Sequence, residues 1–116
     1  MTEAETNIRE SLLSTLLFLA SETQQREFAA KVFYASYSDE FASWWFDTFC
    51  PDEPSALHMF SEVQLATLRS FSATFDRNLA ELRDGERTIE QLLQEPRWQS
   101  IVTSSRTTLA QLVGAI

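Results

Sequence analysis

Residues 60–85 read FSEVQLATLRSFSATFDRNLAELRDG, and their apolar positions repeat with the period of an α-helix. Ser61 and Gln64 have the spacing of a capping box, in which each side chain accepts from the backbone N–H of the other residue. Gly85 is of a residue type that commonly ends helices. The stripe between these signals consists of Leu65, Leu68, Ser72, Phe75, Leu79 and Leu82. The sequence therefore predicts one long helix that packs a single face against the rest of the chain.

The remaining chain carries similar helical signals, including another capping-box pair at Thr88 and Gln91. The expected helices cover residues 6–20, 21–33, 41–49 and 88–94, and a last segment that begins at Pro96. Residues 36–39, SYSD, are weakly helical and either continue or interrupt the second of these helices. No stretch alternates apolar and polar residues with the period of a strand. We therefore expect residues 1–116 to form a single compact all-α domain of five to six helices.

The composition excludes several classes of function. Seventeen Asp and Glu against nine Lys and Arg give a formal net charge of −8. Because affinity for phosphate backbones comes mostly from Lys and Arg, we do not expect nucleic acid as a partner. The single cysteine excludes an internal disulfide and a multi-cysteine metal site. The two glycines, Gly85 and Gly114, cannot form the usual phosphate-binding loops.

The apolar run SLLSTLLFLA at residues 11–20 lacks the features of a targeting segment. Three glutamates and one arginine precede it, whereas a secretory signal starts with a basic region. The run is also too short to span a membrane. We therefore expect a cytoplasmic protein with no membrane partner.

Residues 32–68 combine negative charge with aromatic side chains. This segment contains six Asp and Glu and no Lys or Arg, so it carries −6 of the total charge of −8. It also holds nine of the fourteen aromatic residues. Like charges placed this close repel each other, so a basic partner would give the arrangement a purpose.

Helical geometry separates the residues of this segment. At about 100° per residue, Phe41, Trp45 and Phe49 share a core-facing stripe with Trp44 at its edge. Glu40 and Asp47 lie just beyond Trp44, and a helix that includes Tyr37 would extend this exposed ridge to that residue. Interface anchors are commonly Tyr and Trp with a charged rim, so we expect a docking surface here. The candidate partner-binding residues are Tyr37, Asp39, Glu40, Trp44, Phe46, Asp47, Asp52 and Glu53. The alternative is that every aromatic fills the core and the acids only solvate one face.

No catalytic residue, metal ligand or cofactor site is predicted. Cys50 and His58 are the residue types of a nucleophile and base, but no orienting group or oxyanion hole can be identified. His58 and Glu62 are too few ligands for a metal site. Adjacent carboxylates such as Asp39 and Glu40 do not face each other on a helix. An enzyme that uses Cys50 with His58, or a carboxylate-bound metal, is therefore the least favoured hypothesis.

Three further features resemble small immunity proteins of bacterial toxin–immunity systems, including those of contact-dependent inhibition. They are WWFD at residues 44–47 before PDEP at 51–54, Phe60–Ser61 at the start of the long helix, and LLQEPRW at residues 92–98. The resemblance implies a cytoplasmic, non-enzymatic protein that binds and blocks a cognate toxin, often a basic nuclease.

Two functional hypotheses follow from these observations. The first is an acidic binding protein that neutralises a basic partner, such as the nuclease domain of a toxin. The second is a helical adaptor that self-associates through Trp44 and Tyr37, with the acidic residues keeping it in solution. The sequence leaves open whether the protein is a monomer or a homodimer.

Overall fold

The computed structural model describes residues 1–82 and 85–114, and its secondary structure there is entirely helical. The helices in this part of the chain are α1 (Glu3–Ala20), α2 (Glu22–Lys31), α3 (Tyr37–Phe46), α4 (Ala56–Met59), α5 (Glu62–Glu81), α6 (Ile89–Gln94) and α7 (Pro96–Gly114). The all-α prediction is confirmed, whereas the predicted five to six helices fall short of these seven. The additional helix is α4, a single turn whose N-cap Ser55 makes no side-chain hydrogen bond, so the sequence carries no start signal for it.

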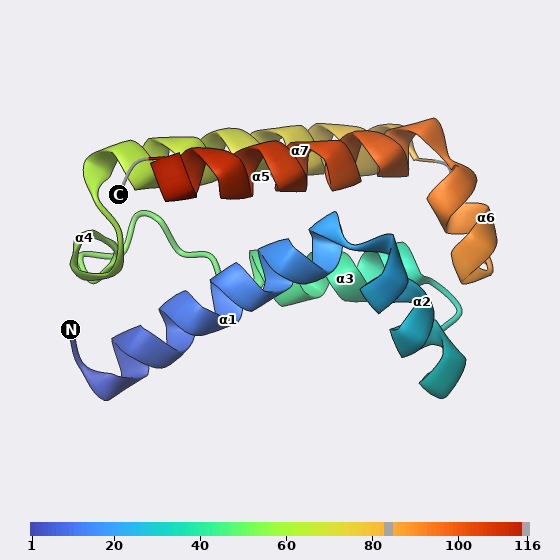
Figure 1. Cartoon of the computed structure of the whole chain (residues 1–116), viewed down its shortest axis with the longest axis horizontal. Coiled ribbons are helices and arrows are strands. Elements are labelled where there is room, and N and C mark those ends of the chain that lie inside the picture. Colours follow the sequence, from blue (N-terminus) through green and yellow to red (C-terminus); the bar gives the residue numbers. More distant parts are fainter. Residues whose placement is uncertain (83–84, 115–116) are drawn as a thin grey trace.

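The helices form two layers that are closed at both ends (Figure 1). In one layer α5 and α7 lie side by side and run antiparallel. In the other, α1 packs against α7 and α3 packs against α1. Helix α4 lies at the end where α1 begins and α7 finishes, while α2 and α6 meet at the opposite end. None of the helices described is long and apolar enough to cross a membrane.

The core lies where the apolar faces of four long helices meet. Its fully buried members include Leu12, Leu16, Leu19, Phe41, Trp45, Leu68, Phe71, Phe75, Trp98, Ile101 and Val102. Burial of this apolar surface supplies most of the driving force for folding. Ser72 is a polar residue within the apolar stripe of α5, and its hydroxyl accepts a hydrogen bond from the indole N–H of Trp45 at 2.7 Å.

A second polar link crosses the core at Gln25, whose side chain is fully buried. Its amide oxygen accepts from the indole N–H of Trp98 at 2.9 Å. Its amide nitrogen donates to the carbonyl oxygens of Leu19, at 3.1 Å, and Phe18, at 3.3 Å. A single side chain therefore ties α2 to α7 and to the last turn of α1.

Capping residues account for most helix starts. The predicted capping boxes at Ser61–Gln64 and Thr88–Gln91 are complete, and α7 begins at Pro96 as expected. An unpredicted capping box at Thr2–Glu5 starts α1 at Glu3, three residues earlier than the apolar pattern indicated. Acidic residues in the first turn also interact favourably with the helix dipole, so this segment is helical despite its polarity.

Three helices end earlier than predicted. Helix α2 ends at Lys31 and leaves Phe33 in the link to α3. Helix α3 ends at Phe46, shortly before the two prolines of the next loop, which disfavour helix. Helix α5 ends at Glu81, and Gly85 then adopts a φ of 141°, a conformation that favours glycine.

Candidate functional site

Helix α3 presents Glu40, Trp44 and Asp47 on one flank, as the helical spacing predicted. The Trp44 ring is half-buried and packs edge-on against Phe18 of α1 and Phe28 of α2, with ring centroids 5.1 Å apart in both pairs. Its indole N–H donates to Glu40 Oε1 at 3.1 Å. The ring is thus fixed in place by contacts on three sides, which lowers the loss of side-chain conformational entropy when a partner binds.

A shallow recess of about 450 Å³ opens beside Trp44, between α1 and α3. Its lining combines two aromatic rings with hydroxyl and amide groups, and consists of Ser11, Ser14, Thr15, Phe18, Gln24, Trp44 and Thr48. These groups offer both hydrogen-bond partners and an aromatic surface to a side chain of another protein. A half-buried Trp with polar surroundings is a common composition for an interface anchor.

The carboxylates of residues 32–68 differ in their pairing. Asp52 forms an ion pair with Arg69, at 2.9 Å, and both side chains are well exposed. Glu40, Asp47 and Glu53 have no Lys or Arg of the described residues within ion-pair distance. The surface of this segment therefore keeps most of its negative charge.

The cations of the chain are mostly engaged within the fold. Arg26 pairs with Glu90, Arg87 with Glu95, and Arg97 with Glu81. Two further arginines donate to main-chain carbonyls, Arg9 to Met59 at 3.1 Å and Arg106 to Ala20 at 2.9 Å. Most of the arginines are therefore bonded within the fold, and of these only Arg69, at Asp52, forms an ion pair with a carboxylate of residues 32–68.

Tyr37 does not belong to the exposed ridge that the sequence suggested. Its side chain is buried, and its hydroxyl donates to the carbonyl of Val32 at 3.0 Å. The ring packs against Phe41 and Tyr34 in the core. Because α3 begins at Tyr37, this residue lies in the first turn, where the link from α2 folds over it.

Phe46 and Asp39 lie on the other flank of α3. Phe46 is 37% exposed and packs against Phe75 of α5, with ring centroids 5.1 Å apart. Asp39 is exposed beside a groove that α5 also lines. The eight candidate residues therefore do not form one continuous surface, and the part around Trp44 is the best formed.

Cys50 and His58 are not joined by a hydrogen bond in the described part of the chain. Instead His58 Nδ1 lies 2.7 Å from Glu5 Oε2, which links α4 to the first turn of α1. The backbone N–H of Thr2 and the His58 side chain hold the pKa of Glu5 below its ordinary value of 4.5. No group of three or more His, Cys, Asp or Glu among the described residues could hold a metal ion.

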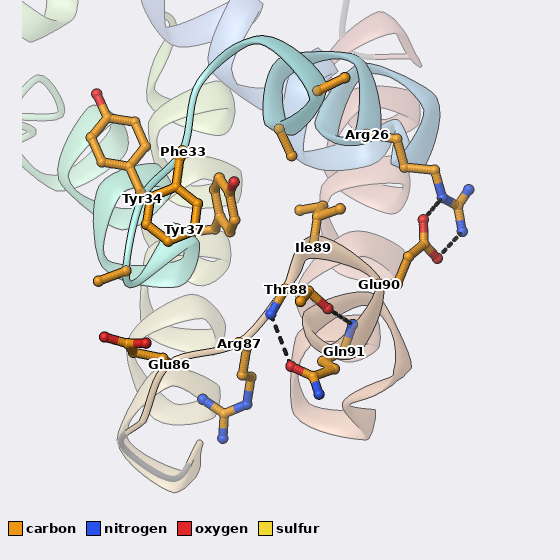
Figure 2. Close-up of a pocket in the computed structure, with 13 residues that line it drawn as sticks. Arg26, Phe33, Tyr34, Tyr37, Glu86, Arg87, Thr88, Ile89, Glu90 and Gln91 are labelled. Carbon is orange, nitrogen blue, oxygen red and sulfur yellow. Dashed lines mark hydrogen bonds and ion pairs between the residues drawn. The ribbon is translucent and has the colours of Figure 1, made fainter.

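Sequence reasoning missed a second hollow, at the end where α2 and α6 meet. This groove of about 500 Å³ runs between α2 with its following link and residues 86–91 (Figure 2). Phe33 stands at its edge and is 83% exposed. The only sequence signal is the apolar pair Val32–Phe33, which the apolar pattern assigns to the end of the helix predicted over residues 21–33.

No protein-family model, curated protein or solved structure matches this chain. Its function is therefore argued from its own residues.

Proposed function

We propose that this chain is a non-enzymatic acidic binding protein that neutralises a basic partner, in the manner of an immunity protein that blocks a toxin in the cytoplasm. The observation that carries the proposal is the separation of charge in the fold. Carboxylates of residues 32–68 remain at the surface, with Glu40 bonded to the fixed Trp44, while most arginines are bonded to other groups of the same chain.

This surface suits recognition of a protein with exposed Lys and Arg. Complementary charge accelerates encounter and selects partners, whereas buried aromatic contacts supply most of the lifetime of a complex. Glu40 and Asp47 flank Trp44 and serve the first role, and Trp44 with the adjoining recess serves the second. A basic nuclease is a partner of this chemistry, because its own site is built to attract phosphate.

The competing adaptor hypothesis used Trp44 and Tyr37 as a symmetric interface. Tyr37 is buried, so that interface would have one exposed anchor instead of two. Binding of a basic partner requires no contact with Tyr37. This hypothesis is therefore better supported than self-association through α3.

The test is affinity capture from the native host with the full chain as bait, compared with two double variants. Glu40→Lys/Asp47→Lys reverses charge beside Trp44, and Glu10→Lys/Asp76→Lys makes the same change in net charge at exposed sites on α1 and α5. We expect the wild type and the control to capture the same basic protein, and the α3 variant to lose it. Equal recovery of that protein by both variants would refute the proposed surface.

The captured protein then permits a kinetic test of the same idea. We expect its association rate with the wild type to fall as salt rises, since screening shortens the range of the attraction. The α3 variant should associate at least about tenfold more slowly at low salt, with little effect on dissociation. Full inhibition of the captured protein's activity by the wild type would complete the case for an immunity function.

A further inference from the structure

The groove at the α2–α6 end has two walls of different origin. One wall comprises Ala29 and Ala30 of α2 and the link that follows. The other comprises residues 86–91, including Ile89. Figure 2 draws Phe33 and Tyr37 on one side and Ile89 on the other. The volume of about 500 Å³ lies in the range of sites that accept a large side chain or a small molecule.

Phe33 is an aromatic ring with no place in the core of its own molecule. At 83% exposed, it is more accessible than any other large hydrophobic side chain among the described residues. Its neighbours are packed inward, because Tyr34 stacks on Phe28 and Tyr37 is buried. An exposed aromatic beside an apolar groove is typical of a protein interface.

The two walls of the groove carry opposite formal charges. Along residues 26–37, Arg26 and Lys31 outweigh Glu27, which gives a formal charge of +1. Along residues 86–91, two glutamates outweigh Arg87, which gives −1. The two walls are thus of opposite sign and together neutral, although the whole chain carries −8.

We propose that this groove binds a second copy of this chain, in a two-fold dimer in which Phe33 of each copy enters the groove of the other. In such an arrangement the same surface is used twice, so the +1 wall of one copy faces the −1 wall of the other. Two molecules of −8 repel each other overall, and the charges of the two groove walls, which cancel, add no net repulsion to this contact.

The charges at the groove edges also pair across this arrangement. Lys31 and Glu86 are exposed, and neither forms an ion pair with another described residue. Arg26, by contrast, is already held by Glu90 in two hydrogen bonds, of 2.6 and 3.2 Å. Lys31 of one copy and Glu86 of the other therefore provide two equivalent contacts about the two-fold axis. This dimer leaves Trp44 outside the interface, so it is independent of the function proposed above.

Sedimentation equilibrium of the full chain tests the dimer. We expect the weight-average mass to rise from 13.3 kDa toward twice that value with increasing concentration. Phe33→Ser should raise the dissociation constant at least about thirtyfold, as expected for an interface hot spot. Leu57→Ser, at another exposed apolar residue, is the matched control and should have no effect. A wild type that stays monomeric, or a Phe33→Ser variant that dimerises equally well, would overturn the proposal.

A charge exchange tests the two-fold pairing separately. Lys31→Glu and Glu86→Lys should each weaken the dimer, because each places like charges opposite one another twice. The double variant restores opposite charges and should recover most of the wild-type dissociation constant. If the double variant is as weak as the two single changes combined, the proposed pairing is wrong.

Discussion

Replacement of Gln25 by leucine should be among the most damaging single changes in this fold. Gln25→Leu keeps a side chain of similar size but removes the acceptor of the Trp98 indole N–H and the donor to the Leu19 carbonyl. Phe18 loses less, because its carbonyl also accepts from the backbone N–H of Ser21. Two buried polar groups would be left without partners.

The size of the effect follows from those two groups. Each unsatisfied buried group costs about 1–3 kcal/mol, so we expect a loss of about 3 kcal/mol after allowance for the added apolar surface. This is a large part of the roughly 5–15 kcal/mol that stabilises a typical domain. Urea unfolding monitored by circular dichroism should show the midpoint falling by about 1–3 M.

Two controls isolate the buried hydrogen bonds. Gln24→Leu makes the same chemical change at the neighbouring, exposed position of α2 and should leave the midpoint nearly unchanged. In a Trp98→Phe background, which lacks the indole N–H, Gln25→Leu should cost about half as much as in the wild type. If Gln25→Leu and Gln24→Leu shift the midpoint equally, the buried network does not stabilise the protein.

Three further results are expected. Ser72→Ala leaves the Trp45 indole N–H without its acceptor and should lower the free energy of unfolding by about 1–3 kcal/mol in urea, whereas Ser70→Ala, at an exposed site on the same helix, should not. Tyr37→Phe removes the hydroxyl that donates to Val32 and should cost about 1 kcal/mol, with faster amide hydrogen exchange in residues 32–36 as its local sign. The pKa of Glu5 is lowered in the fold, so the ionised carboxylate stabilises the protein above the ordinary value of 4.5, and this effect is lost as pH falls through the folded pKa. The melting temperature of Glu5→Gln should therefore fall less than that of the wild type between pH 7 and pH 3.

The helices that could be predicted are those whose signals lie within a few residues of each other. The capping boxes at Ser61 and Thr88 and the proline at 96 set α5, α6 and α7 because each acts on its own helix turn. The first turn of α1 was missed because Glu3 and Glu5 contribute no apolar pattern. These glutamates act at the start of the helix instead, where the Glu5 carboxylate accepts from the backbone N–H of the N-cap residue Thr2.

The candidate site could be predicted from the sequence only in part, for a different reason. Helical spacing placed Trp44 beside Glu40 correctly, since both belong to one helix. The positions of Tyr37 and Phe33 depend on where α2 ends and on how its link folds over α3, which no local spacing encodes. Gln25 is a similar case, because only the arrangement of α1, α2 and α7 around it makes a polar residue fully buried.

The placement of the chain ends affects how this protein can be labelled. The start of α1 and the end of α7 lie together at the α4 end, while the groove lies at the other end of a molecule 39 Å long. A tag on either terminus therefore leaves the groove accessible to solution. In the two-fold dimer, tags on the two copies would point in opposite directions. A proximity reporter fused to the termini would then read a genuine dimer as negative, and a dye placed near Phe33 is the better label.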